Sequence, residues 1–131
     1  MTVEFKLLIW SLGLTFVQML VAVIGTIYCL GIPKAAGNRE RVPELPGWAG
    51  RARRAHFNMI ENMVLFAPLI IIADIAGRDN GMTELGAELF FWARLAYAVI
   101  YLIGIPWLRT LAWAVSVIGM VMIAWVLLQA L

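Results

Sequence analysis

Ionisable and amide side chains recur at helical spacing within otherwise apolar sequence, and these residue types are suited to binding an anion. Arg51, Arg54, Asn58 and Glu61 follow i, i+3, i+7, i+10 spacing, so they would share one face of a helix. A guanidinium binds a carboxylate through paired hydrogen bonds, and a guanidinium next to a thiol favours its thiolate. The spacing therefore predicts a polar face that receives a negatively charged ligand.

A second polar stripe follows in the later half of the chain. Arg94, Tyr97 and Tyr101 have i, i+3, i+7 spacing, and Arg109 comes shortly after them. A charged side chain near the bilayer centre costs about 2.5–3.5 kcal/mol, so we expect both stripes to face each other or a common cavity. The structural alternative is that Glu61 pairs with an arginine and that the arginines near segment ends only anchor the helices.

Composition limits the remaining possibilities. The 131 residues are 63% hydrophobic and 14% charged, whereas soluble domains have about 45–50% and about 25%. Cys29 is the only cysteine and His56 the only histidine, which excludes an internal disulfide and a multi-histidine metal site. The net charge of +2 is too small to indicate a nucleic-acid partner. The composition instead indicates a lipid environment.

Four long apolar segments must position these side chains. We predict one domain with spans at 7–32, 51–76, 83–105 and 107–131, that is, an all-α membrane protein with a four-helix bundle. About 20 helical residues cross the roughly 30 Å hydrocarbon core, and these runs are too long for barrel strands. A signal peptide is the competing interpretation of the first segment, but its apolar run would be only about 7–15 residues long.

The distribution of basic residues predicts the orientation. Cytoplasmic loops are enriched in Lys and Arg. The second loop carries only Arg78, and the third connection carries Arg109. The first loop and the start of the second segment carry Lys34, Arg39, Arg41, Arg51, Arg53 and Arg54. We therefore expect the first and third loops to be cytoplasmic and both termini to be non-cytoplasmic, with Trp113 among the interfacial aromatic residues.

The two motifs resemble those of a known family. The run Arg51-x-x-Arg54-Ala55-His56-x-Asn58-x-x-Glu61 resembles the signature of the MAPEG superfamily, the membrane-associated proteins in eicosanoid and glutathione metabolism. The run Arg94-x-x-Tyr97-x-x-x-Tyr101, followed by Pro106 and Arg109-Thr110, resembles the third and fourth helices of that family. Chain length, the four segments and the basic first loop also agree, so the resemblance covers nearly the whole chain.

The resemblance implies a homotrimer that binds glutathione as co-substrate between adjacent subunits. It implies that Arg109 stabilises the glutathione thiolate and that the other motif residues bind glutathione: Arg51, Arg54, Asn58, Glu61, Arg94, Tyr97 and Tyr101. The activity implied is that of a glutathione transferase or peroxidase acting on a hydrophobic substrate in the bilayer. The short chain resembles bacterial members, which implies the bacterial inner membrane. Several members carry tyrosine directly after the glutamate, where this chain has Asn62.

Two other functions stay open at this point. The first is a non-catalytic lipid-binding or scaffold protein of the same fold, which the absence of that tyrosine favours. The second is a small channel or transporter, which would need charged residues along a continuous path across the midplane. The charges lie instead toward one half of the second segment, and the first and last segments carry few polar residues. The transferase interpretation therefore ranks first.

Overall fold

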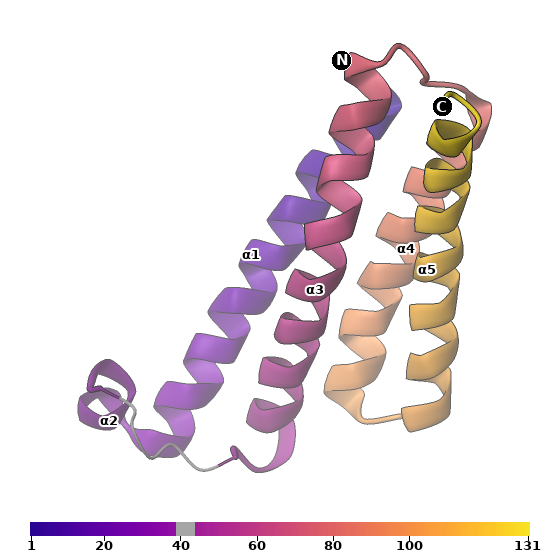
Figure 1. Cartoon of the computed structure of the whole chain (residues 1–131). Helices are drawn as coiled ribbons and strands as arrows, with labels where there is room; N and C mark the ends of the chain where they lie inside the picture. The colour runs from indigo at the N-terminus through magenta and orange to yellow at the C-terminus, as the bar shows by residue number, and fades with distance from the viewer. Residues whose placement is uncertain (39–43) are drawn as a thin grey trace.

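The chain folds into a bundle of four long helices, seen in a computed structural model that describes residues 1–38 and 44–131 (Figure 1). The helices are α1 (Val3–Leu30), the short α2 (Ile32–Ala36), α3 (Gly47–Ile75), α4 (Gly81–Ile103) and α5 (Pro106–Leu128). The described residues contain no strand. The four long helices alternate in direction, so both termini lie at the same end of the bundle.

The outer surface of the bundle is apolar. All four long helices are long and apolar enough to cross a membrane. Large side chains such as Ile24, Val64 and Trp125 point outward with more than half of their surface exposed. Water would solvate such a surface poorly, whereas lipid tails solvate it well. The protein is an integral membrane protein, and the predicted all-α fold with four spans is confirmed.

The helix boundaries differ from the predicted spans mainly at the helix starts. α3 begins at Gly47, four residues before Arg51, and continues through Pro68. α2 lies in the stretch expected to be loop, while Arg39 and Arg41 of that loop lie outside the described residues. The residue that caps α4 is Asn80, three residues before Thr83, where the third predicted span begins. Thr83 instead completes a capping box with Asn80, in which each side chain bonds the other residue's backbone N–H.

The bundle consists of two closely packed helix pairs, α1 with α3 and α4 with α5. α4 and α5 approach at Gly86 and Gly119, where a Cβ on Gly86 would lie 2.6 Å from the Gly119 carbonyl oxygen. The two pairs meet through a buried core in which the Phe66 and Phe90 rings stack with centroids 3.8 Å apart. This core holds α3 against α4, the two helices that carry the predicted polar stripes.

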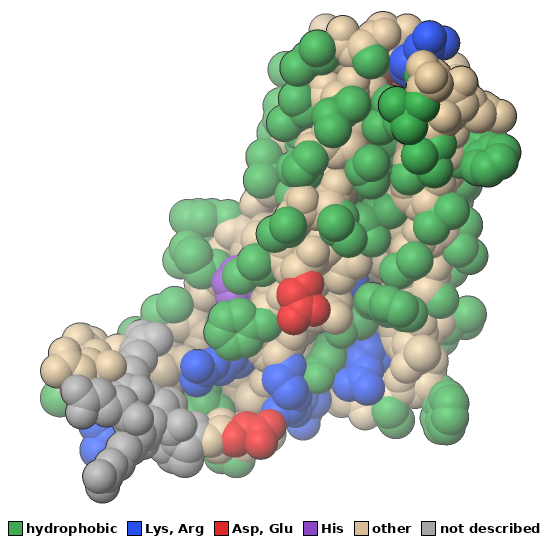
Figure 2. Space-filling view, in the orientation of Figure 1, with side chains coloured by type: hydrophobic (Ala, Val, Ile, Leu, Met, Phe, Trp, Pro, Cys, Tyr) green, Lys and Arg blue, Asp and Glu red, His purple; other side chains and the backbone are tan. Residues whose placement is uncertain are grey.

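Charge divides the bundle into two ends. We call the start of α3 and the α4–α5 turn the basic end, since it carries Arg51, Arg54 and Arg109. Lys and Arg side chains gather there in the space-filling view, while hydrophobic side chains cover most of the remaining face (Figure 2). The opposite end, where α1 begins and α3 turns into α4, carries Glu4, Asp74 and Asp79 and is called the acidic end.

Candidate functional site

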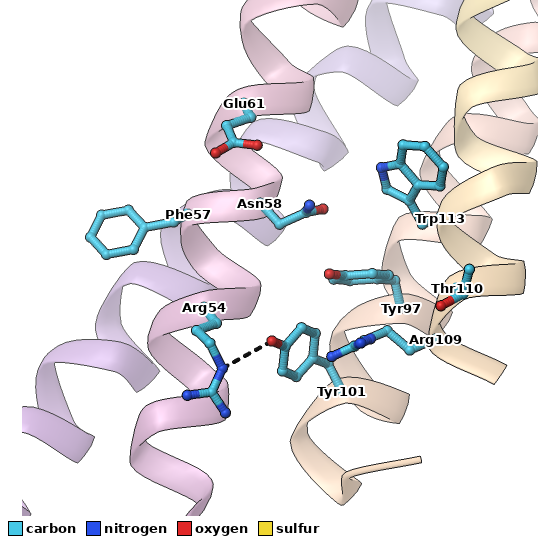
Figure 3. A pocket seen from close by; sticks show the side chains of 9 residues that line it. All are labelled: Arg54, Phe57, Asn58, Glu61, Tyr97, Tyr101, Arg109, Thr110 and Trp113. Atoms are coloured by element: carbon cyan, nitrogen blue, oxygen red, sulfur yellow. Dashed lines mark hydrogen bonds between the residues drawn. The ribbon is translucent and has the colours of Figure 1, made fainter. Parts of the chain in front are cut away.

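A cavity of about 400 Å³ opens at the basic end between α3, α4 and α5 (Figure 3). Its lining residues are Arg54, Phe57, Asn58, Glu61, Tyr97, Tyr101, Arg109, Thr110 and Trp113. The volume lies within the roughly 300–1,000 Å³ typical of small-molecule sites. The cavity therefore brings together side chains from three helices in a space large enough for a ligand.

The first turns of α3 hold Arg54 at the mouth of this cavity. The segment before α3 folds back so closely that a Cβ on Gly50 would overlap the Leu45 carbonyl oxygen. This close approach brings Glu44 to Arg54, and their Nη1 and Oε1 atoms form an ion pair at 2.8 Å. Both side chains are well exposed, at 45% and 79%, so water screens this pair strongly. Glu44 therefore orients Arg54 without neutralising it for a ligand.

Tyr101 joins the two arginines of the cavity. Arg54 Nε donates a hydrogen bond to Tyr101 Oη at 3.0 Å, and the Arg109 guanidinium carbon lies 4.5 Å from the Tyr101 ring centroid. Tyr97 packs edge-on against Tyr101, with ring centroids 5.5 Å apart. A guanidinium over an aromatic ring is stabilised by the negative face of the ring. The tyrosines thus hold two guanidinium groups in place without supplying a counter-charge.

Glu61 and Asn58 form the opposite wall on α3. Figure 3 shows Asn58 directed toward α4 and α5, with Glu61 one turn further along the same face. Glu61 forms no ion pair with any described residue, so the pairing of Glu61 with an arginine that we considered is not seen in this part of the chain. The α3 side of the cavity therefore offers one carboxylate and one amide next to the Arg54 guanidinium, and Arg109 lies on α5 across the cavity.

Arg51 and Arg94 do not line this cavity. Arg51 lines a smaller neighbouring cavity at the basic end. Arg94 is buried with 1% of its surface exposed, and its guanidinium carbon lies 4.1 Å from the Tyr97 ring centroid. No described residue accepts a hydrogen bond from its guanidinium nitrogens. Both arginines satisfied the helical spacing, but packing places them outside the larger cavity, Arg51 beside Tyr101 in the smaller one and Arg94 against Tyr97.

Three lining residues were not among the predicted site residues. Trp113 is four residues after Arg109 and shares its face of α5, a spacing that helical periodicity makes visible, whereas Thr110 directly follows Arg109 and does not have this spacing. Trp113 was expected only as an interfacial aromatic residue. Phe57 lies at the edge, where Figure 3 shows its ring directed away from the other lining side chains. These residues add an aromatic border to the polar cavity.

Asn62 directly follows Glu61 on α3. It is buried, and its Nδ2 donates to the Asn58 backbone oxygen at 2.8 Å and to Asn58 Oδ1 at 3.2 Å. Asn58 Oδ1 therefore already accepts one hydrogen bond and keeps one lone pair, while its Nδ2 bonds to no described residue. Asn62 thus occupies one of the two acceptor positions of the Asn58 oxygen.

Comparison with known proteins agrees with these observations. The MAPEG family model matches residues 7–129, nearly the whole chain. Neither the curated proteins nor the solved structures gave a significant match. The matched range includes all nine residues that line the cavity.

Proposed function

The chain belongs to the MAPEG family, and from its cavity we propose that it is a membrane-bound glutathione transferase or peroxidase. The family associates it with the membrane proteins of eicosanoid and glutathione metabolism. The observation that carries the proposal is that Arg54 and Arg109 both reach one open cavity in which Glu61 is the only described carboxylate. Such a cavity carries a net positive charge and suits an anionic ligand.

The functional groups of glutathione match those of the cavity. Glutathione has two carboxylates, one ammonium group and one thiol. A guanidinium binds a carboxylate by a charge-assisted hydrogen bond, which suits the Arg54 Nη2 group that no described residue engages, and the carboxylate of Glu61 suits the ammonium group. The amide of Asn58 and the phenol of Tyr97 complete the polar wall. Arg109 is then the remaining guanidinium group, and we assign it to the glutathione sulfur.

Arg109 would supply the electrostatic step. A free thiol has a pKa of about 8.5, so only a few per cent is thiolate at pH 7. A guanidinium within about 4–6 Å favours the thiolate, which is the nucleophile. In conjugation the sulfur forms a bond to an electrophilic carbon, and the leaving group departs with its electron pair. In peroxide reduction the thiolate breaks the O–O bond, and a second glutathione reduces the resulting sulfenic acid.

The second substrate would arrive from the bilayer. Trp113 and Phe57 border the cavity with 41% and 49% of their surfaces exposed on the lipid-facing surface of the bundle. An apolar molecule dissolved in lipid can therefore reach the polar cavity without crossing water. This arrangement favours hydrophobic electrophiles or lipid hydroperoxides as substrates.

A glutathione titration tests the proposal. Ligand binding raises the Tm of the purified protein when the ligand concentration exceeds Kd. We expect Arg54→Gln to weaken glutathione binding about 10- to 100-fold, because a charge-assisted contact contributes about 1.5–3 kcal/mol. Arg53→Gln is the matched control, since Arg53 lies on the same turn but outside the cavity and stacks on Phe57. No Tm shift at millimolar glutathione would refute glutathione use.

A non-catalytic lipid-binding protein is the second candidate, and Asn62 is the observation that favours it. Asn62 engages Asn58 Oδ1, where several relatives place a tyrosine. Asn62→Tyr distinguishes the two functions. If the cavity binds glutathione, this substitution frees the Asn58 oxygen and should tighten binding. A lipid-binding protein would show no glutathione-dependent change in either form.

We further propose that the protein is a homotrimer in the bacterial inner membrane with its basic end in the cytoplasm. The basic residues at the α3 start support this orientation. Cys29, the only cysteine, is exposed near the end of α1 at the basic end. Its accessibility therefore reports on which side of the membrane the basic end lies. A membrane-impermeant maleimide added to intact spheroplasts should leave Cys29 unmodified, and lysis should expose it. Modification of Cys29 before lysis would show that the basic end lies outside the cytoplasm and would contradict the proposed orientation.

A further inference from the structure

A second, smaller cavity lies at the basic end beside the proposed glutathione site. Its volume is about 130 Å³, and its lining residues are Arg51, Arg54, Tyr101, Gly104, Ile105, Pro106 and Arg109. Three guanidinium groups line it, and no described carboxylate does. Arg51 distinguishes this cavity, since it lines this one and not the larger one. We propose that this cavity binds the phosphate of an anionic phospholipid headgroup.

The position of Arg51 supports this assignment. Its Nε donates a hydrogen bond to the Leu102 carbonyl at 3.1 Å, one of the carbonyls in the last turn of α4 that no helix N–H can satisfy. This bond fixes the guanidinium plane, while neither Nη atom bonds to a described residue. The Nη groups thus remain as a preformed fork of donors, the geometry that matches phosphate oxygens.

The α4–α5 turn is shaped to admit this side chain. Gly104 ends α4 in the left-handed region at φ 96°, and a Cβ there would lie 3.4 Å from Arg51 Nε. The following helix begins at Pro106 without a side-chain cap, so its first N–H groups remain free. Free N–H groups at a helix start favour an anion. These N–H groups supplement the three guanidinium groups, which are the main anion-binding donors of the cavity.

The depth of the cavity favours a lipid over a dissolved anion. Trp107 and Ile103 flank the turn with 85% and 65% of their surfaces exposed. Tryptophan concentrates at the level of the lipid headgroups, and an exposed isoleucine next to it would sit at the edge of the acyl chains. A phosphate at this level belongs to a lipid, and basic pockets between membrane helices bind such headgroups.

Lipid titration of the full chain tests the inference. The protein, purified in a neutral detergent, is titrated with phosphatidylglycerol or with phosphatidylcholine of the same acyl chains, and bound lipid is counted by native mass spectrometry. We expect a preference for phosphatidylglycerol, and Arg51→Gln should weaken its binding about tenfold through loss of a charge-assisted contact. Arg53→Gln, which removes the same charge two residues away, should change binding less than twofold. Equal losses in the two variants would overturn the inference.

Two further measurements make the result decisive. Binding of inorganic phosphate is measured in the same way. If it binds as tightly as phosphatidylglycerol and its binding depends equally on Arg51, the proposal that a lipid occupies the cavity is wrong. If Arg51→Gln does not fold, phosphatidylglycerol with a photoreactive headgroup is applied to the unsubstituted protein. Labelling should fall within residues 44–54 or 101–109, and labelling confined to other segments would overturn the site. Glutathione binding is measured on the same Arg51→Gln variant, and because Arg51 does not line the larger cavity, each proposal can fail while the other stands.

Discussion

The two ends of the bundle use polar residues in opposite ways. At the acidic end Thr83 Oγ1 donates to Glu4 Oε1 at 2.7 Å, both side chains are buried, and Asn80 caps α4 through two backbone N–H groups. At the basic end Arg54 and Arg109 line an open cavity, where Arg54 bonds Tyr101 and Glu44 through Nε and Nη1 and its Nη2 has no described partner. The acidic end satisfies these polar groups internally, and the basic end leaves some guanidinium donors free.

This difference separates structural from binding roles more clearly than residue type does. A buried polar group that lacks a partner costs free energy, so groups that bond to each other contribute to stability. Free guanidinium groups in a solvent-accessible cavity contribute little to stability and remain available to a ligand. Substitutions at the acidic end should therefore change unfolding, whereas substitutions at the basic end should change binding and turnover.

The largest expected effect is on turnover at the basic end. Arg109→Ala should lower kcat/KM for glutathione conjugation about 10- to 100-fold, because the thiolate loses a charge-assisted contact. The pH at which kcat/KM rises should move up toward the pKa of a free thiol, about 8.5. Steady-state conjugation assays across pH measure both quantities.

Two control variants accompany this substitution: one keeps the positive charge at residue 109, and the other removes an arginine elsewhere in the bundle. Arg109→Lys keeps the charge and should restore part of the rate. Arg78→Ala removes an arginine from the α3–α4 turn, far from the cavity, and should leave the pH profile unchanged. Unaltered turnover in Arg109→Ala would remove this residue from the chemistry and would weaken the contrast between the two ends.

The next largest effect is on stability at the acidic end. Thr83→Val keeps the side-chain shape but removes the hydroxyl that bonds Glu4 and the Asn80 N–H. We expect the free energy of unfolding in detergent to fall by about 1–2 kcal/mol, with glutathione affinity unchanged. Thr15→Val is the control, since its hydroxyl bonds only the Ser11 carbonyl within its own helix. Equal destabilisation by the two variants would contradict a special role for the Glu4 contact.

The two ends also differ in how far the sequence predicts them. Helical periodicity together with a resemblance to a family placed Arg54, Asn58 and Glu61 on one face, and these residues line the cavity. The contact between Glu4 and Thr83 joins residues 79 positions apart, so no local pattern indicates it. Asn80 and Thr83 are both acceptable capping residues, and only the backbone decides between them.

Arg94 marks the limit of periodicity at the basic end. It has the same spacing as Tyr97 and Tyr101, yet its guanidinium is buried against the Tyr97 ring and outside the cavity. A helical wheel gives the direction of a side chain but not how far a cavity extends along the helix. Arg94 lies about one turn further from the basic end than Tyr97, beyond the residues that line the cavity.

A smaller effect should come from the phenol that joins the two arginines. Tyr101→Phe removes the hydrogen bond from Arg54 Nε but keeps the ring under Arg109. A single hydrogen bond contributes about 1 kcal/mol, so glutathione Kd should rise about fivefold while the Tm without ligand changes little. Tyr28→Phe is the control, because Tyr28 is exposed and does not line the cavity. A fall in Tm with unchanged Kd would assign Tyr101 to structure, as at the acidic end.

The smallest effect concerns pH at the acidic end. Partial desolvation, followed by the negative charges of Glu4 and Asp74, raises the pKa of the Asp79 carboxyl above its ordinary value. The folded state therefore holds this proton more tightly than the unfolded state, and stability falls as pH rises from the ordinary pKa through the raised one. Asp79→Asn should unfold at a higher temperature than the unsubstituted protein above that interval and at the same temperature below it. The gain should not exceed about 0.5 kcal/mol, because Asp79 is exposed and solvent screens it.

Thermal unfolding between pH 3.5 and 8 measures the difference, and Glu84→Gln on the exposed side of α4 is the control. If the gain in unfolding temperature of Asp79→Asn were largest at low pH, the pH dependence would be opposite to the expected one and would contradict repulsion among these carboxylates.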